Sequence, residues 1–335
     1  MAHVAVLGAG SWGTALAQVL AINGHDVFLW GRNAAQMDEM RNARENKKYL
    51  PNVTLHPRLE IGNAFPPLTD CEYVIVSAPA QSQRRLIEDH LDDFVKSGAV
   101  LVNVAKGIET MSQKCIHEIY EELIDDVDKR FIVLSGPSHA EEFGKNMPTA
   151  LVAASSCREV AEGVQTLFMN ENVRVYTSHD VVGVELGGAL KNIIALAVGM
   201  TVGLGYGDNA RAALMTRGLA EITRLGVALG AEPYTFLGLT GMGDLIVTCT
   251  SMHSRNYRAG LMLGQGKNLQ DVLDNMGMVV EGVSTTRAAH TLAVRKNIEM
   301  PILEQMYHVL FEGGDVREAV RILMTRQKKP EPEQY

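Results

Sequence analysis

The sequence has 335 residues, of which 46% are hydrophobic and 21% are charged. These values are typical of a globular protein with enough material for about two domains. The net charge of −8 argues against nucleic acid as a main partner, because a phosphate backbone is bound by an excess of Lys and Arg. An anionic ligand must therefore be held by a local group of cations and backbone N–H groups.

The chain opens with a predicted strand, a glycine-rich turn and a helix. Residues 4–7 (V-A-V-L) predict a short buried strand, and Gly8, Gly10 and Gly13 follow with the spacing G-x-G-x-x-G. The first glycine permits a tight turn, the second lets a pyrophosphate approach the backbone, and the third lets the helix pack closely. The predicted helix 14–23 points its free N–H groups and positive dipole end at that pyrophosphate. Because a second strand follows, the pattern predicts dinucleotide binding rather than a plain glycine-rich turn.

Short apolar, β-branched runs alternate with helix-like stretches along the first half of the chain. The predicted strands are 4–7, 26–30, 73–77, 99–104, 131–134, 150–154 and 173–177. Continuous apolar runs are typical of strands covered on both faces, so they predict a parallel sheet in a doubly wound α/β domain. Ligands of such sheets bind outside the carboxyl ends of the strands.

From residue 179 onward, apolar residues recur at helical spacing and predict an all-helical second domain. The predicted helices are 180–201, 211–229, 269–275, 284–296, 304–312 and 316–325. We therefore expect a dinucleotide-binding domain at 1–178, a helical substrate domain at 179–326 and a flexible polar tail at 327–335. The uncharged stretch 193–207 is too short for a membrane span, so we expect a buried helix and a turn there.

The four cysteines, Cys71, Cys115, Cys157 and Cys249, lie far apart and show no metal-ligand spacing. We expect reduced thiols that are buried or half-buried, no metal, and a cytoplasmic location. No secretory signal precedes the first predicted strand. The sequence leaves the oligomeric state open, and a homodimer is compatible with it.

The end of the second predicted strand bears on which dinucleotide binds. An acidic residue that would hold the ribose hydroxyls of NAD is expected there, but the chain has Gly31 and Arg32. An Arg at this place can pair with a 2′-phosphate and lie flat against the adenine. The alternative is a solvated surface Arg. We expect the site to accept NADP without excluding NAD, and FAD fits a helical second domain less well.

Two lysines occupy positions that suggest chemistry. Lys106 follows a predicted strand, so its ammonium should emerge at the carboxyl edge of the sheet. Lys191 lies in a helix nearly free of charge, where desolvation lowers the pKa of an ammonium towards neutrality and suits proton exchange with a hydroxyl or carbonyl oxygen. Gly187 and Gly188 are expected to leave room beside it for a ligand. The alternative is that Lys191 reaches the surface or pairs with Glu185.

A third polar group combines Asp244 with Ser254, Arg255 and Asn256, which stand at a predicted helix start. A guanidinium, two polar side chains and free backbone N–H groups suit a phosphate ester. Asp244 lies between glycines and an apolar run, and could accept hydrogen bonds from substrate hydroxyls. The alternatives are a helix N-cap with an exposed Arg, and a carboxylate that merely forms a turn.

On its motifs the chain resembles the bacterial NAD(P)-dependent sn-glycerol-3-phosphate dehydrogenases over nearly its whole length. The motifs are G-A-G-S-W-G at 8–13, V-A-K-G-I at 104–108, L-S-G-P-S-H-A at 134–140, E-L-G-G-A-L-K-N at 185–192, N-A-R-A-A-L-M-T-R-G at 209–218, G-D-L at 243–245, S-R-N at 254–256 and V-V-E-G at 279–282. The resemblance implies a Rossmann domain followed by a helical domain related to that of 6-phosphogluconate dehydrogenase. It also implies reversible reduction of dihydroxyacetone phosphate, a small phosphate ester, to glycerol 3-phosphate for glycerophospholipid synthesis.

The resemblance further implies roles for single residues, with Lys191 as the catalytic acid and base. The implied substrate contacts are Lys106, Gly136, Ser138, Lys191, Asp244, Ser254, Arg255 and Asn256. The implied cofactor contacts, beside the three glycines of the first turn, are Ser11, Trp12, Arg32, Lys106, Ala140, Arg255, Val279 and Glu281.

Two other functions remain open on the sequence alone. A dehydrogenase of a β-hydroxyacid or of a sugar phosphate acid would need a partner for the substrate carboxylate, which the Ser254–Asn256 cluster could supply. A non-catalytic NAD(P)H sensor would bind cofactor without turnover. That second function leaves Lys191 without a purpose, and the sequence contains no appended DNA-binding segment to report the sensed state.

Overall fold

The computed structural model describes residues 1–328, 330 and 331, and the chain divides into two compact units. Unit 1 comprises Met1–Ala105 and Ile116–Val181, and unit 2 comprises Lys106–Cys115 together with the chain from Val182 onward. The last crossing between the units lies close to the boundary expected between 178 and 179. Part of the tail expected at 327–335 falls outside the described residues.

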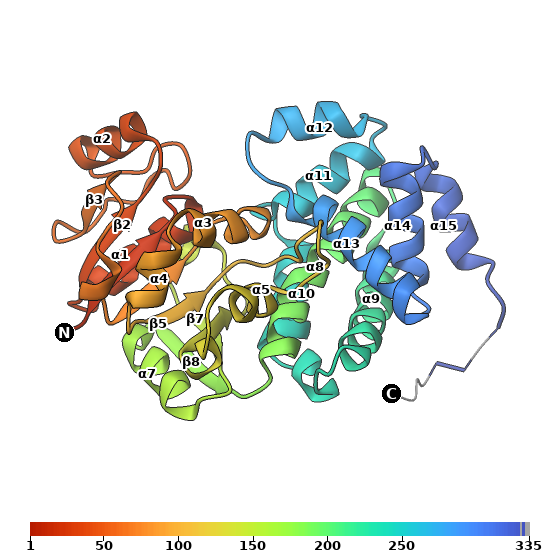
Figure 1. Cartoon of the computed structure of the whole chain (residues 1–335). Helices are drawn as coiled ribbons and strands as arrows, with labels where there is room; N and C mark the ends of the chain where they lie inside the picture. The colour runs from red at the N-terminus through yellow and green to blue at the C-terminus, as the bar shows by residue number, and fades with distance from the viewer. Residues whose placement is uncertain (329, 332–335) are drawn as a thin grey trace. The chain divides into compact units, whose positions relative to one another are not determined.

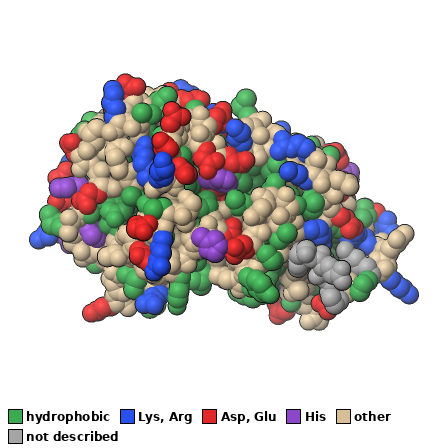
Figure 2. Space-filling view, turned by 60° about the horizontal axis from the view of Figure 1, so that its bottom comes forward, with side chains coloured by type: hydrophobic (Ala, Val, Ile, Leu, Met, Phe, Trp, Pro, Cys, Tyr) green, Lys and Arg blue, Asp and Glu red, His purple; other side chains and the backbone are tan. Residues whose placement is uncertain are grey.

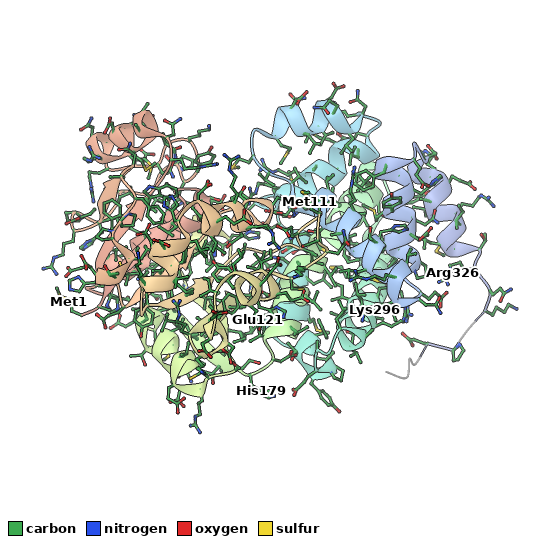
Figure 3. All side chains as sticks on the ribbon, viewed as in Figure 1. Met1, Met111, Glu121, His179, Lys296 and Arg326 are labelled. Atoms are coloured by element: carbon green, nitrogen blue, oxygen red, sulfur yellow. The ribbon has the colours of Figure 1, made fainter. Side chains whose placement is uncertain are left out.

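The segment Lys106–Cys115 belongs to unit 2, although the sequence pattern placed it in the first domain. Ile108 is fully buried in the hydrophobic core of unit 2. Glu109 N donates to the carbonyl of Lys114, which closes the segment into a compact turn. Met111 is 92% exposed (Figure 3). Ile108 and the buried Cys115 therefore join this short loop to the core of the helical unit. A loop of ten residues shows no periodicity from which this could be predicted.

Unit 1 contains an eight-stranded sheet with the order β3-β2-β1-β4-β5-β6-β7-β8 (Figure 1). The strands are β1 (His3–Leu7), β2 (Asp26–Trp30), β3 (Glu60–Gly62), β4 (Tyr73–Val76), β5 (Val100–Asn103), β6 (Phe131–Ser135), β7 (Thr149–Ala154) and β8 (Val173–Ser178). All neighbours from β3 to β6 pair in parallel, which confirms the expected parallel sheet for that part. The strand order reverses between β1 and β4, where the glycine-rich turn leaves β1.

The expectation of a parallel sheet is wrong for the last two strands. β7 pairs antiparallel with β6, and β8 runs parallel to β7. A parallel connection needs a crossover of a dozen or more residues, usually with a helix that spans the sheet. The segment between β6 and β7 contains only the one-turn helix α6 (Ala140–Phe143), so the chain returns in the opposite direction. The apolar runs marked the strands correctly but carried no information on their direction.

The helices of unit 1 pack in groups that the contacts define. α1 contacts α6 and α7, while α3 contacts α4 and α5. The helices are α1 (Ser11–Ile22), α2 (Ala34–Ala43), α3 (Gln83–Asp89), α4 (Leu91–Lys96), α5 (Ile116–Leu123), α6 and α7 (Arg158–Phe168), with short 3-10 helices at Leu68–Asp70, Ala80–Ser82 and Val127–Lys129. The buried side chains of β1 and α1 form one continuous core with β2, β6 and α7.

From Val182 onward, the described residues of unit 2 form helices joined by short connections, as expected. Its elements are α8 (Val181–Gly203), α9 (Asp208–Ala228), η4 (Pro233–Leu237), η5 (Leu239–Gly243), α10 (Asp244–Thr250), α11 (Arg255–Gly264), α12 (Leu269–Met276), α13 (Glu281–Lys296), α14 (Pro301–Phe311) and α15 (Val316–Met324). α8 is long and apolar enough to cross a membrane, but 89% of its most apolar window is buried inside the protein. It is the core helix of unit 2, which confirms the prediction of a buried helix rather than a span.

Lys and Arg side chains are interspersed with Asp and Glu over the face shown in Figure 2. Among the described residues on this face, no extended basic surface gathers. This distribution agrees with the negative net charge.

Glycines bring the backbones of α8 and α11 into direct contact. A Cβ at Gly199 would lie 2.2 Å from a backbone oxygen of α11, and a Cβ at Gly260 would lie 2.1 Å from a backbone oxygen of α8. Gly203 and Gly264 repeat the same contact one turn further along the two helices. No other residue fits at these four positions without separating the helices. The first turn of α11 is thereby held against α8.

We predict that Gly260→Ala lowers the free energy of unfolding by about 3 kcal/mol, because the new methyl group forces two packed helices apart. Gly207→Ala is the matched control in the same unit, since no atom lies within 4 Å of its Cβ position. It replaces a helix N-cap glycine and should cost less than about 1 kcal/mol. Urea denaturation of both variants measures the difference, and equal losses would contradict this packing.

Candidate active site

The glycine-rich turn of unit 1 is shaped by backbone contacts at two of its glycines and by open space at the third. Gly8 has φ +124°, and a Cβ there would lie 3.0 Å from the backbone of Ser77. A Cβ at Gly13 would lie 1.9 Å from the carbonyl oxygen of Gly8. At Gly10, no atom lies within 4 Å of the Cβ position. Packing requires the outer two glycines, and Gly10 leaves the backbone open to a ligand.

The start of α1 is suited to an anion. Its N-cap residue is Gly10, so no side chain caps the N–H groups of the first turn, which begins with Ser11. The indole Nε1 of Trp12 is buried and has no hydrogen-bond partner among the described residues. The Trp12 ring packs against Phe143 of α6 with 4.9 Å between the ring centres, and Ala140 is the first residue of that helix. These unmatched donors fit a bound dinucleotide at this turn.

The remaining expected residues of unit 1 follow the carboxyl ends of strands. Arg32 is exposed and follows β2 after Gly31, where a Cβ would lie 2.7 Å from the Met37 side chain. Gly136 follows β6 with φ +135°, and the Ser138 hydroxyl donates to its carbonyl oxygen at 2.9 Å. Since β2 and β6 belong to the parallel part of the sheet, these loops lie along its carboxyl edge.

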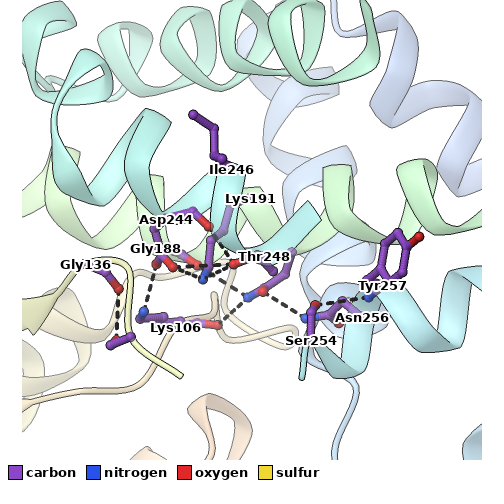
Figure 4. Close-up of polar contacts among 12 residues, drawn as sticks. Lys106, Gly136, Gly188, Lys191, Asp244, Ile246, Thr248, Ser254, Asn256 and Tyr257 are labelled. Carbon is purple, nitrogen blue, oxygen red and sulfur yellow. Dashed lines mark hydrogen bonds and ion pairs between the residues drawn. The ribbon is translucent and has the colours of Figure 1, made fainter. Parts of the chain in front are cut away.

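In unit 2, one carboxylate lies between two lysines (Figure 4). Asp244 Oδ2 is 2.7 Å from the ammonium of Lys106, and Asp244 Oδ1 accepts a hydrogen bond from the ammonium of Lys191. Asp244 is only 1% exposed and Lys191 only 6%. Lys106 comes from the segment Lys106–Cys115, Lys191 comes from α8, and Asp244 is the first residue of α10. Lys191 therefore does not follow the alternative of pairing with Glu185 or reaching the surface.

This arrangement sets the charge of each group. Burial raises the pKa of Asp244, but Lys106 and Lys191 outweigh it and hold the pKa below its ordinary value of 3.8. The pKa of Lys191 is lowered from 10.5 to about 7, chiefly by burial and also by the Lys106 charge, against the attraction of Asp244. The neighbouring thiol of Cys249 stays neutral, because burial raises its pKa to about 12. Lys191 is thus the group in this cluster that changes protonation near neutral pH.

Thr248 completes the environment of Lys191 and was missed from the sequence. Its hydroxyl oxygen accepts a hydrogen bond from the Lys191 ammonium at 2.7 Å, and the hydroxyl donates to the backbone carbonyl of Asp244 at 2.6 Å. Thr248 stands four residues after Asp244 on α10, so both face Lys191. The spacing in D-L-I-V-T was the available signal, although it needed the partner helix to be known.

Two buried amides connect the Ser254–Asn256 cluster to the lysines. Asn256 Nδ2 donates to Asn192 Oδ1 at 2.8 Å, and Asn192 Nδ2 donates to the backbone carbonyl of Lys106 at 3.3 Å. Asn256 Oδ1 accepts from the N–H of Gly282 at 2.9 Å, next to Glu281 at the start of α13. Asn192, which directly follows Lys191, was not among the expected site residues. The amides place the first turn of α11 beside the Lys191 cluster.

Ser254 forms the helix N-cap that the sequence offered as the alternative to a phosphate contact, whereas Arg255 is half-buried and not the exposed Arg of that alternative. Ser254 is the N-cap of α11 and accepts from the N–H of Tyr257 at 3.1 Å. Arg255 Nη1 donates to the carbonyl of Val279 at 3.1 Å. The expected contacts Arg255, Val279 and Glu281 therefore lie in one part of unit 2.

The role expected for Gly187 is wrong. A Cβ at Gly187 would lie 2.7 Å from the carbonyl oxygen of Thr240, so this position is filled by the η5 segment and not by a ligand. The carbonyl of Gly188 accepts from Asn192 Nδ2 at 3.4 Å. Gly187 allows two segments to pack closely. In the sequence alone, a glycine with this role looks the same as one that leaves room for a ligand.

Comparison with known families agrees with this arrangement of two units. Residues 3–161 match the family described as NAD-dependent glycerol-3-phosphate dehydrogenase N-terminus, and residues 180–321 match its C-terminus. The chain belongs to the NAD-dependent glycerol-3-phosphate dehydrogenase family. It is therefore an NAD(P)-dependent oxidoreductase with a Rossmann-type domain followed by a helical domain.

Individual glycerol-3-phosphate dehydrogenases are similar along the whole chain. A glycerol-3-phosphate dehydrogenase [NAD(P)+] of Bacillus anthracis is 54% identical over 335 residues, covering 99% of this chain and 98% of that protein. The structure of the glycerol-3-phosphate dehydrogenase of Coxiella burnetii is 35% identical with a TM-score of 0.89, covering 97% of this chain and 99% of that one. The enzyme of Saccharomyces cerevisiae is 26% identical with a TM-score of 0.78, covering 95% and 98%.

We predict that Asp244→Asn lowers the reductive kcat/KM at pH 7 by at least about a hundredfold. Without the carboxylate, the attraction that favours the Lys191 ammonium is lost, so the pH at which the reductive rate halves should move below about 7. Asp274→Asn, at an exposed carboxylate of α12, is the matched control and should leave the profile unchanged. If the pH profile of Asp244→Asn coincided with that of the control, Asp244 would not be the group that favours the Lys191 ammonium.

Proposed function

We propose that this glycerol-3-phosphate dehydrogenase uses Lys191 as both the acid and the base of its reaction. The enzyme reduces dihydroxyacetone phosphate to sn-glycerol 3-phosphate with NADPH or NADH, and the product feeds glycerophospholipid synthesis. The observation that carries the proposal is the single Asp244 carboxylate shared by two lysines, one of them buried in an apolar helix.

The proton step follows from the pKa of Lys191. In reduction, the ketone carbon receives a hydride and its oxygen takes a proton from the Lys191 ammonium, which leaves a neutral amine. In oxidation, the neutral amine takes the proton of the alcohol as the hydride leaves the carbon. Because burial brings the pKa of Lys191 to about 7, both forms are populated near neutral pH. A nicotinamide cofactor held by the glycine-rich turn would supply or accept the hydride.

The neighbours of Lys191 orient its ammonium. Asp244 and Thr248 each accept one hydrogen bond from the Lys191 ammonium. Its third N–H is left to face the carbonyl oxygen of the substrate. Lys106 neutralises the other oxygen of Asp244 and adds positive charge beside the reacting oxygen. These fixed charges stabilise negative charge that develops on that oxygen during hydride transfer.

We assign the phosphate of the substrate to the first turn of α11. The N–H groups of this turn carry the positive end of the helix dipole, and Arg255 adds a guanidinium beside it. Asn256 is held by Asn192 and by the N–H of Gly282, so the turn is fixed relative to Lys191. Anchoring the phosphate there presents the carbonyl to Lys191, and Gly136 and Ser138 complete the expected substrate contacts.

We assign the cofactor pyrophosphate to the start of α1, with Gly8, Gly10 and Gly13 in the roles argued above. Arg32 is exposed at the end of β2 and is available to a 2′-phosphate, so the proposal includes NADPH as well as NADH. A cytoplasmic location and a homodimer are also part of the proposal. The free thiols of all four cysteines support the reducing compartment.

We predict that Lys191→Ala lowers kcat for dihydroxyacetone phosphate by about 10²–10⁴-fold with NADPH and with NADH, because the proton donor is removed. In the unsubstituted enzyme, the reductive kcat/KM should fall as pH rises above about 7 and the oxidative kcat/KM should rise there. Reduction needs the ammonium and oxidation the amine, which fixes both signs.

The matched control is Lys296→Ala, at an exposed lysine of α13 (Figure 3), and it should leave both rates unchanged. Lys191→Ala that keeps more than about a tenth of the turnover would remove Lys191 from the acid and base role.

A further inference from the structure

Three polar side chains of unit 1 are completely buried where β4 and β5 end. Gln83, the first residue of α3, Asn103, the last residue of β5, and Tyr120 of α5 are each 0% exposed. None of them belongs to the glycine-rich turn or to the Lys191 cluster. A polar group without a partner is costly to bury, so the bonds that these three make are informative.

The side chains form one connected hydrogen-bond network. Tyr120 Oη donates to Gln83 Oε1 at 3.1 Å. The Gln83 amide nitrogen lies within donor distance of the backbone carbonyl of Ala78, at 3.2 Å, and of Asn103 Oδ1, at 3.4 Å. Asn103 Oδ1 also accepts from the backbone N–H of Ala105 at 3.0 Å. The network thus joins α3 and α5 to the chain that leaves the two strands.

The network supplies partners that the sheet no longer provides. Beyond the ends of β4 and β5, backbone N–H and carbonyl groups lose their ladder partners, and a buried backbone group without a partner is destabilising. Ala78 and Ala105 are the residues served by the network on the two sides. Apolar side chains would pack as well at these buried positions but would leave both backbone groups without a partner and free to shift.

Both strand ends lead directly to functional segments. Ser77, next to Ala78, forms the wall against which Gly8 and Gly13 pack, at 3.0 Å from their Cβ positions. Ala105 is the residue immediately before Lys106, which forms the ion pair with Asp244. A shift of the backbone at Ala105 therefore moves the root of the Lys106 side chain.

We propose that Gln83, Asn103 and Tyr120 are positioning residues, which fix the backbone at Ala78 and Ala105 and thereby hold Lys106 on Asp244. This inference rests on the proposed function, because it takes the Lys106–Asp244–Lys191 cluster to be the catalytic one. The three residues touch neither substrate nor cofactor in this account. They act through the backbone that carries Ser77 and Lys106.

A specific kinetic consequence follows from the charges. Lys106 and Lys191 share one carboxylate, and the Lys106 charge lowers the pKa of Lys191. When Lys106 is held less firmly, its charge repels the Lys191 ammonium less. The Asp244 carboxylate is then shared less with Lys106 and attracts Lys191 more strongly. The Lys191 ammonium then persists to higher pH, so the midpoint of the reductive pH profile should rise. Loss of global stability alone does not move this midpoint.

The test uses the full chain with two substitutions of nearly unchanged volume. Asn103→Leu removes the acceptor for Ala105 and for Gln83, and should lower kcat/KM for dihydroxyacetone phosphate by about tenfold, the effect of one hydrogen bond of ordinary strength. Tyr120→Phe removes a single hydroxyl and should lower it by about threefold. In both variants the midpoint of the reductive pH profile should rise, by about half a pH unit in Asn103→Leu.

Ser155→Ala is the matched control. Ser155 is 2% exposed, and its hydroxyl donates to the carbonyl of Phe131 at 2.7 Å, at the opposite end of β6 from the site. It should lower the melting temperature as much as Tyr120→Phe does, with unchanged kcat/KM and an unchanged pH profile. If Tyr120→Phe and Asn103→Leu matched Ser155→Ala in both kinetic measures, the positioning role would be overturned.

Two further results separate the possible failures. If Asn103→Leu does not fold, Tyr120→Phe decides alone, because it removes one oxygen atom from a packed ring. Should Lys191→Ala retain activity, the proposed catalytic cluster fails and the inference fails with it. A loss of activity in Lys191→Ala together with unshifted profiles in both network variants overturns the positioning role only.

Discussion

The rest of the site depends on one carboxylate that two lysines share. Asp244 is almost fully buried and can neutralise only one positive charge, so the cluster with Lys106 and Lys191 carries one excess charge. A buried charge is unfavourable unless it is paired. The cluster can lose its excess charge at the least cost if one of the two lysines releases a proton more readily. Lys191 is the lysine that releases its proton more readily, because burial and the neighbouring Lys106 charge lower its pKa to about 7. The proton transfer that we propose for Lys191, in both directions near neutral pH, depends on this balance.

The fold provides the cluster from segments that are far apart in the chain. Lys106 comes from the segment that crosses into unit 2 and is fixed there by the buried Ile108. Lys191 lies in the middle of α8, and Asp244 begins α10 directly after the π-helical turn η5, an irregularity common at functional sites. The glycine contact between α8 and α11 fixes the first turn of α11, where we propose that the substrate phosphate binds, beside this cluster through Asn256 and Asn192. Close backbone packing therefore determines where the side chains of the proposed catalytic cluster lie relative to the first turn of α11.

Seven of the eight strands of unit 1 and the long helices of unit 2 were predictable from the sequence, because each is a local hydrophobic pattern with its own period. The strand β3 was missed, because its three residues are too few to show such a pattern. The direction of β7 was not predictable, since it depends on whether the connection from β6 contains a helix long enough to cross the sheet, and it contains only the one-turn helix α6. The unusual Lys191 could be recognised from the cost of burying a charge in an apolar helix. Thr248, which accepts a hydrogen bond from Lys191, and Asn192, which donates to the backbone of Lys106, were missed because their roles depend on contacts between segments distant in sequence. Gly187 was misread for the same reason, since a glycine that admits a ligand and one that admits a neighbouring backbone look alike in sequence.

The most direct test is a titration of the Lys191 side chain in the cofactor-free protein. Nitrogen-15 labelling of lysine side chains, with Lys191→Ala to assign the signal, follows the ammonium by NMR as pH is raised. The shared carboxylate and the buried position predict a midpoint at about 7. A midpoint near 10.5, the ordinary value for lysine, would contradict the central claim that burial and a divided counter-charge prepare Lys191 for proton transfer.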